Sequence, residues 1–152
     1  MIELIIRFIG RGLICGFFGA LGFGLIINLP KKSVVLSALF GGIAYMFYDI
    51  LLFYFGQIYL ATFFSSVLVA TYSELLARKF KMPAIIFIVP GIVALVPGVG
   101  LYKTILKLLD NDFFGFLRQG TETIFIACAI AAAIATVNIT VRTVCSRFRR
   151  KA

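Results

Sequence analysis

The residues with the clearest capacity for chemistry lie in an apolar stretch that contains a Pro-Gly pair twice. Each proline removes a backbone N–H group and clashes with the preceding helical turn, and each glycine loosens the chain further. Two such pairs in one apolar segment predict a discontinuous or sharply kinked helix. The residues of this segment that we expect to bind a substrate are Pro90, Gly91, Pro97, Gly98, Gly100, Tyr102 and Lys103.

A helix broken within a membrane leaves backbone amides available to an anion. Non-helical backbone at that depth is tolerated only where protein or a wet cavity satisfies it, and transporters aim such half-helix N-termini at anionic groups. The free N–H groups and the helix dipole favour a carboxylate there. Lys103, about one turn past Gly98, would add a full positive charge and Tyr102 a hydroxyl. The alternative is a proline kink that only shapes helix packing.

Two acidic residues lie within long apolar runs. A carboxylate inside a bilayer is costly and often belongs to an ion or proton pathway, so Asp49 and Glu74 are the candidates for proton coupling. Asp49 can instead lie near the outer interface. Glu74 precedes Arg78 by four residues, a spacing that favours a stabilising helical ion pair. A third acid, Glu122, is expected in the first turn of the last helix, where it complements the helix dipole.

The ionisable residues otherwise exclude several classes of protein. The chain has no histidine, and its three cysteines show no short pairing, which leaves few ligands for zinc or haem. We therefore expect no metal and no cofactor, and the sequence offers no enzyme motif. The net charge of +9 comes from short basic clusters between apolar runs. That arrangement is typical of loops beside a bilayer rather than of a nucleic-acid-binding face.

The apolar runs predict the elements that must position these residues. Hydrophobic residues make up 62% of the 152 residues and charged residues 14%, against about 25% charged in soluble domains. We predict an all-α integral membrane protein, a single transmembrane domain over residues 1–152, with a bundle of about five helices and a Pro/Gly-broken fourth helix. The expected spans are about 12–29, 33–55, 58–77, 83–109 and 121–142.

The distribution of Lys and Arg predicts the orientation. An N-terminus outside and a C-terminus in the cytoplasm place most basic residues on the cytoplasmic side, as the positive-inside rule requires. Stripes of small residues predict close helix contacts, within the bundle or against another subunit. The first stripe contains Gly12, Gly16, Ala20 and Gly24, and the second Ala127, Ala131 and Ala135.

The sequence from about residue 19 to residue 141 resembles the threonine/serine exporter family, in particular its C-terminal half. The resemblance rests on a core of two Pro-Gly pairs followed by a tyrosine, with matching segments upstream and an alanine-rich helix downstream. These segments are Ala20–Gly24, Asn28–Pro30, Thr62–Phe64, Glu74–Arg78, Met82–Ala84, Val89–Ile92, Leu95–Gly98 and Tyr102. Asp49 matches no motif of that family.

The resemblance implies one subunit of a secondary transporter in the inner cell membrane. It implies export of small carboxylate metabolites, either threonine and serine or a C4 dicarboxylate such as succinate, driven by the proton gradient. At this length the chain is similar to the small, separately encoded half, which works with a larger five-span partner subunit. The alternatives are a non-transporting assembly subunit of such a complex and a passive channel.

Overall fold

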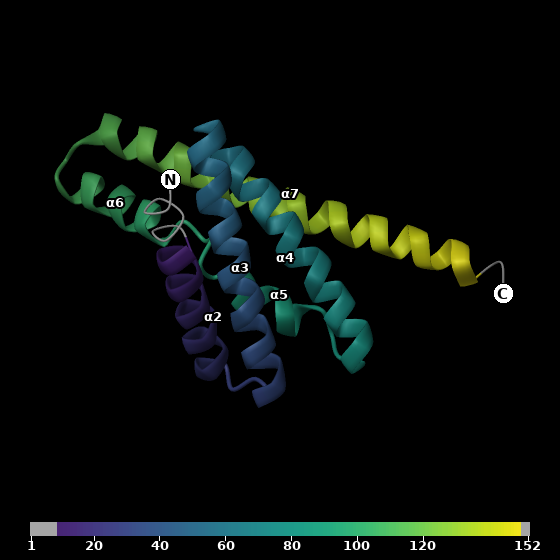
Figure 1. Cartoon of the computed structure of the whole chain (residues 1–152). Coiled ribbons are helices and arrows are strands. Elements are labelled where there is room, and N and C mark those ends of the chain that lie inside the picture. The colour runs from purple at the N-terminus through teal and green to yellow at the C-terminus, as the bar shows by residue number, and fades with distance from the viewer. Residues whose placement is uncertain (1–8, 150–152) are drawn as a thin grey trace.

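The computed structural model describes residues 9–149, and every regular element in that range is a helix (Figure 1). The prediction of an all-α chain is therefore confirmed. The elements in chain order are η1 (Ile9–Leu13, a π-helical turn), α2 (Ile14–Ile26), α3 (Lys31–Phe55), α4 (Ile58–Phe80), α5 (Ile85–Ile92), α6 (Gly98–Leu109) and α7 (Phe113–Arg149).

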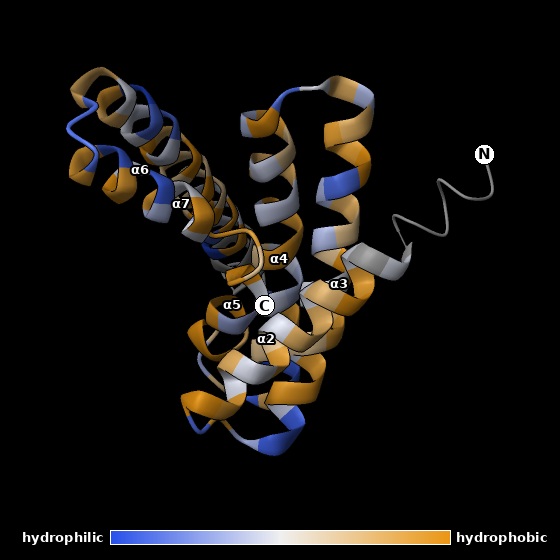
Figure 2. Ribbon diagram, turned by 90° about the vertical axis from the view of Figure 1, so that its left-hand side faces the viewer, coloured by the Kyte–Doolittle hydropathy of each residue, from blue (hydrophilic) through white to orange (hydrophobic). Residues whose placement is uncertain are grey.

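Three of these helices are long and apolar enough to cross a membrane. They are α3, α4 and the Phe113–Thr143 part of α7, and α2 is a shorter apolar helix. Many large apolar side chains on them face outward, such as Phe18, Leu75 and Ile124, which are all more than half exposed. Hydrophilic residues gather mainly at the helix ends (Figure 2). An outer surface of this kind suits lipid, and the chain is an all-α membrane protein.

The α3–α4 hairpin turns within two residues, Gly56 and Gln57. Gly56 adopts the left-handed conformation, with φ of 64°, and its amide donates to the Leu52 carbonyl at 2.9 Å. Glycine is the residue that ends a helix in this way without steric cost. The long apolar region 33–77 is therefore divided at the place that the sequence predicts.

The first stripe of small residues packs α2 closely on α3. A methyl group added to Gly16 would lie 2.8 Å from Tyr45 Cβ and 2.9 Å from Gly42 Cα, and one added to Gly24 would lie 3.2 Å from Val34 Cγ1. The second stripe, on α7, behaves differently, because Ala127, Ala131 and Ala135 all lie on its exposed face. Of these two stripes, the first is the one that joins two helices among the described residues.

The predicted fourth segment is two helices joined by Val93–Pro97. The expected break is confirmed at the second Pro-Gly pair, because Pro97 (φ −77°, ψ 58°) stands immediately before α6. It is wrong at the first pair, since Pro90 and Gly91 lie inside α5. That helix has only eight residues and ends at Ile92, so Pro90 removes one hydrogen bond near an end that frays in any case.

The last helix begins at Phe113, well before the expected residue 121. Asp112 precedes it and accepts a hydrogen bond from the Gly115 amide at 2.9 Å, as an N-cap residue does. Its second carboxylate oxygen lies 2.9 Å from Lys107 Nζ. Hydrogen bonds from Lys107 and from the Gly115 amide hold the pKa of Asp112 below its ordinary value. Glu122 consequently lies in the third turn of α7, and its expected role in the first turn is wrong.

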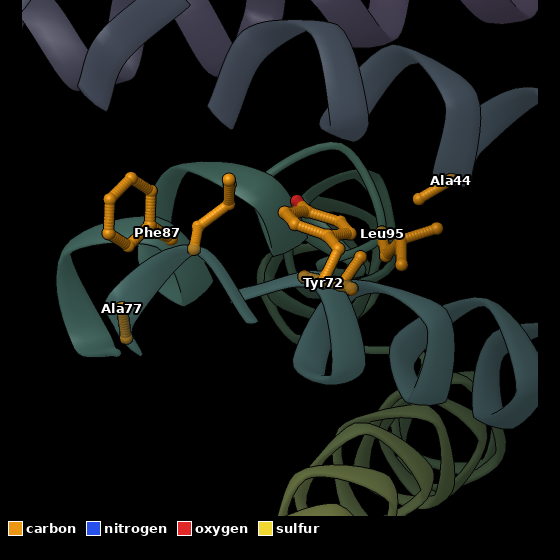
Figure 3. Packing of buried hydrophobic residues seen from close by; sticks show 7 residues of the cluster. Ala44, Tyr72, Ala77, Phe87 and Leu95 are labelled. Carbon is orange, nitrogen blue, oxygen red and sulfur yellow. The ribbon is translucent and has the colours of Figure 1, made fainter. Parts of the chain in front are cut away.

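The hydrophobic core joins α3, α4 and α5. Tyr72 stacks on Phe40 with ring centroids 4.4 Å apart and an interplanar angle of 20°. Phe87 of α5 is fully buried, and Leu95 of the α5–α6 connection packs into the same cluster. Figure 3 shows Tyr72, Phe87 and Leu95 gathered where α4 and α5 meet below α3. The interrupted segment thus packs on the bundle through α5.

Candidate functional site

A cavity of about 510 Å³ lies beside the helix interruption. This volume falls within the range of about 300–1,000 Å³ typical of small-molecule sites. Its walls come from α3, α4, the α5–α6 connection, α6 and α7. The residues that line it are Tyr45, Tyr48, Ile58, Tyr59, Thr62, Ala94, Leu95, Val96, Pro97, Gly98, Val99, Gly100, Lys103, Gln119, Glu122, Thr123 and Ile126.

The N-terminus of α6 forms one wall of this cavity. The Gly98 amide donates back to the Val96 carbonyl at 2.8 Å, and the Leu101 amide donates to the Pro97 carbonyl at 3.0 Å. Val99 and Gly100 lie between them in the first helical turn, where amides have no acceptor within the helix. The positive end of the helix dipole lies at the same place. This wall is therefore suited to a carboxylate.

Close packing of α6 on α7 holds that wall in place. A methyl group added to Gly100 would lie 2.7 Å from Thr123 Oγ1, and one added to Gly120 would lie 3.3 Å from Thr104 Cγ2. Nothing lies within 4 Å of the corresponding position at Gly98. Gly100 is thus required for the approach of the two helices, whereas Gly98 leaves space in the cavity.

The cavity carries two opposite charges from different helices. Lys103 of α6 supplies an exposed ammonium group, and Glu122 of α7 supplies a partly buried carboxylate. Glu122 Oε1 lies 3.7 Å from Arg118 Nε, but the Arg118 side chain is 86% exposed, and such a surface pair is weak. A ligand with a carboxylate and an ammonium group can meet an opposite charge at both ends.

Hydroxyl groups complete the polar lining. Tyr45 and Tyr48 come from α3, and Tyr59 comes from the first turn of α4. Thr62 and Thr123 donate their hydroxyl protons to carbonyls of their own helices, at 2.8 and 2.7 Å, which leaves oxygen lone pairs as acceptors. The cavity therefore suits a small polar solute.

The family model of the threonine/serine exporter ThrE matches residues 12–140. The chain belongs to the threonine/serine exporter family. No curated protein and no solved structure matches it. The family match extends from η1 into α7 and includes every residue that lines the cavity. Membership indicates a membrane transport role rather than an enzymatic one.

In this exporter, four of the seven predicted binding residues reach the cavity. They are Pro97, Gly98, Gly100 and Lys103. Tyr102 lies outside the lining and is 62% exposed, because the residue next to Lys103 on a helix faces another direction. Pro90 and Gly91 are buried within α5 and also lie outside it. Both residues pack in the core and do not line the cavity.

Neither predicted proton carrier of the exporter lines the cavity. Asp49 follows the lining residue Tyr48 on α3 and is partly buried. Glu74 lies 12 residues beyond Thr62 on α4, which corresponds to about 18 Å along the helix. Their roles in proton coupling stay predictions. Among residues 9–149, no group of three His, Cys, Asp or Glu side chains is placed to hold a metal ion.

Sequence reasoning missed the tyrosines and Glu122 as parts of the site. Tyr45 and Tyr48 are three residues apart on α3, and Tyr59 and Thr62 have the same spacing on α4. Each pair therefore shares one helix face. The sequence therefore does contain a signal for this polar surface, because one polar pair lies on each side of the Gly56 turn.

Proposed function

We propose that this exporter chain moves threonine and serine across the cytoplasmic membrane and binds them as zwitterions in the cavity. The substrate carboxylate lies between the first-turn amides of α6 and Lys103, and its ammonium group lies toward Glu122. The observation that carries the proposal is the presence of both charges beside a helix N-terminus in one cavity. Charge-assisted hydrogen bonds of this kind are the stronger ones.

The same geometry favours an amino acid over a dicarboxylate. A C4 dicarboxylate such as succinate would bring its second carboxylate toward Glu122. Two neighbouring carboxylates repel each other. The side-chain hydroxyl of threonine or serine, by contrast, has hydroxyl partners in Tyr45, Tyr48 and Tyr59. We therefore propose the amino acids as the preferred substrates.

Proton coupling and a larger five-span partner subunit belong to the same proposal. Asp49 and Glu74 are the proposed proton carriers. The proposed orientation, with the C-terminus in the cytoplasm, is supported by the basic residues at the α2–α3 and α4–α5 turns, which include Lys31, Lys32 and Lys81. The cavity then lies in the outer half of the membrane, near the α3–α4 turn.

The test is a comparison of two lysines on α6. Lys103 lines the cavity, whereas Lys107, one turn later, pairs with Asp112 and does not. Export of radiolabelled threonine is measured in cells that lack other exporters for it. We expect Lys103→Gln to lower export about tenfold with a raised half-saturating concentration, because a charge-assisted bond contributes about 1.5–3 kcal/mol. Lys107→Gln serves as the control and is expected to export normally.

Membrane abundance and complex formation are measured for both variants. If Lys103→Gln exports as well as the parent chain, the proposed carboxylate site is wrong. If it loses complex formation as well as export, the chain acts as an assembly subunit. Export that persists against a concentration gradient after the proton gradient is dissipated contradicts proton coupling, and export that never exceeds equilibration indicates a passive channel.

A further inference from the structure

Five buried hydroxyl oxygens in the bundle have no hydrogen-bond partner among the described residues. They belong to Ser37, Ser65, Ser66, Tyr72 and Ser73. The four serines are 0% exposed and Tyr72 is 7% exposed. Buried hydroxyls in folded proteins are normally satisfied by protein groups, ordered water or a ligand. Five such oxygens on two neighbouring helices therefore indicate a place that holds water or a polar solute.

These hydroxyls continue from the cavity along α4. Thr62 lines the cavity, and Ser66 lies one turn further on. Two turns beyond Ser65 and Ser66 are Tyr72 and Ser73, on the same faces of the helix because they are seven residues on. From Thr62 to Ser73 the row covers about 16 Å.

The row then passes to α3 and reaches the other end of the hairpin. The Phe40–Tyr72 stack fixes the level at which the antiparallel helices α3 and α4 meet. Ser37 lies one turn before Phe40, and Ser33 a further turn away. Ser33 Oγ lies 3.5 Å from Met82 Sδ, in the turn after α4. Hydroxyl groups thus extend from the cavity at one end of α4 to the basic turn at its other end.

Apolar packing closes this row near its middle. Val69 is fully buried between the two hydroxyl pairs of α4. The Tyr72 hydroxyl lies so close to Gly91 that a Cβ at Gly91 would collide with it. Figure 3 shows the Tyr72 ring between α4 and α5, beside Leu95. Side chains larger than glycine at position 91 are incompatible with this arrangement.

The element that covers the closure is short and joined by non-helical backbone on both sides. Helix α5 has eight residues, and it lies between the turn after Phe80 and the connection Val93–Pro97. Hinges consist of a few loop or element-terminal residues, and these two joints are segments of that kind. A shift of α5 away from Tyr72 would uncover the hydroxyl row.

We propose that the hydroxyl row is the closed inner half of the solute path, that it fills with water when α5 moves, and that the Tyr72–Gly91 contact is its gate. This rests on the proposed function, since it extends the substrate cavity toward the cytoplasm. Uncharged hydroxyls donate and accept hydrogen bonds with both ends of a zwitterion. Conduction requires contacts weak enough for the solute to leave, and this row has no fixed charge.

The test measures water access to cysteines in the otherwise intact chain. Cys15, Cys128 and Cys145 are first replaced by Ser, and Ser37→Cys is compared with Ala38→Cys. Both positions are 0% exposed, but Ala38 faces α2, since it lies between Val34 and Gly41, which contact Gly24 and Ala20. Inside-out vesicles are treated with a charged, membrane-impermeant methanethiosulfonate reagent, with and without threonine.

We expect Ser37→Cys to react at least tenfold faster than Ala38→Cys in at least one of these conditions. Equal, slow reaction of both variants in all conditions would show dry packing and overturn the proposal. The assay does not measure export, so a failure of the Lys103 test with normal Ser37→Cys labelling would remove the proposed substrate site and leave the path. Reduced export in Lys103→Gln together with slow labelling of Ser37→Cys would contradict the proposed path and leave the proposed substrate site.

A second variant tests the gate. Tyr72→Phe keeps the ring and its stack on Phe40 but removes the unpartnered hydroxyl. Dry packing predicts unchanged export and equal or higher thermal stability. The proposal predicts equal or higher stability together with an export rate about fivefold lower, because the hydroxyl contacts water or solute only in the open state. Unchanged export in Tyr72→Phe would contradict the assignment of this residue to the gate.

Discussion

In the proposed site, Glu122 is the residue that we expect to distinguish between the candidate substrates. Its carboxylate shares the cavity with Lys103, although the two residues come from different helices. We expect Glu122→Gln to weaken threonine binding about tenfold, since the substrate ammonium loses a charged partner, and to leave succinate binding unchanged or stronger. Competition of each compound against labelled threonine in vesicles measures both effects.

A nearby arginine provides the matched control for that prediction. Arg118 lies beside Glu122 but is 86% exposed, so Arg118→Gln is expected to change threonine affinity less than about twofold. Equal losses in the two variants would indicate that the local charge balance matters rather than contact with the ammonium group. Stronger succinate inhibition of the parent chain than of Glu122→Gln would favour the dicarboxylate.

Asp112, which caps α7, makes the stability of the α6–α7 turn depend on pH. Because its pKa is lowered in the folded chain, Asp112 stabilises the α6–α7 turn at pH values above its ordinary pKa of 3.8. This contribution is lost as the pH falls through the lower, folded pKa. We expect the protection factor of the Gly115 amide, which is the exchange rate of an unstructured peptide relative to that of the folded chain at the same pH, to fall over that acidic range in detergent. Asp112→Asn should remove the pH dependence, and an unchanged profile would contradict the assignment.

At the scale of elements, the α6–α7 contact is tested by two glycines of the same helix turn. Gly100 lies against Thr123, whereas Gly98 has open space around it. We expect Gly100→Ala to destabilise the chain by about 1–3 kcal/mol, as overpacking does, and Gly98→Ala to change stability by less than about 0.5 kcal/mol. Thermal unfolding in detergent measures both. A Gly100→Ala variant as stable as Gly98→Ala would show that the helices separate without cost.

The helices themselves follow from hydropathy and backbone chemistry. Gly56 ends α3 and Pro97 precedes α6, and both boundaries can be predicted because those residues restrict the backbone directly. The start of α7 could not be predicted from apolar residues, since a helix continues through polar residues such as Arg118 and Gln119. Its start is fixed instead by the Asp112 cap, a local hydrogen bond.

The site was only partly predictable for a different reason. The α6 amides and Lys103 belong to one continuous segment, so sequence alone brings them together. Tyr45, Tyr59 and Glu122 reach the cavity only when α3, α4 and α7 are placed around that segment. Without knowledge of helix pairing, each of these residues looks like an ordinary interfacial or helix-end side chain.

At the scale of the whole molecule, the glycines of α2 bring that helix close to the backbone of α3. Gly16 faces the α3 backbone, whereas nothing lies within 4 Å of a methyl group added to Gly19. We expect Gly16→Ala to destabilise the bundle by about 1–3 kcal/mol and Gly19→Ala to stabilise it by up to about 1 kcal/mol through helix propensity. Unfolding in detergent measures the difference. Equal stability of the two variants would contradict close packing of α2 on α3.

The length of α7 has a mechanical consequence. Its 37 residues measure about 55 Å, and even at a tilt of 40° a hydrocarbon layer of about 30 Å holds only about 26 of them. One end is tied to α6 by the Asp112 turn, and the other extends away from α4 and the rest of the bundle (Figure 1). Glu122 and Arg142 are about 30 Å apart along this rod. If α7 pivots at Glu122 as a rigid rod, a rotation of about 10° would displace Arg142 by about 5 Å, so a small movement at the cavity would become a larger one near the far end of the helix.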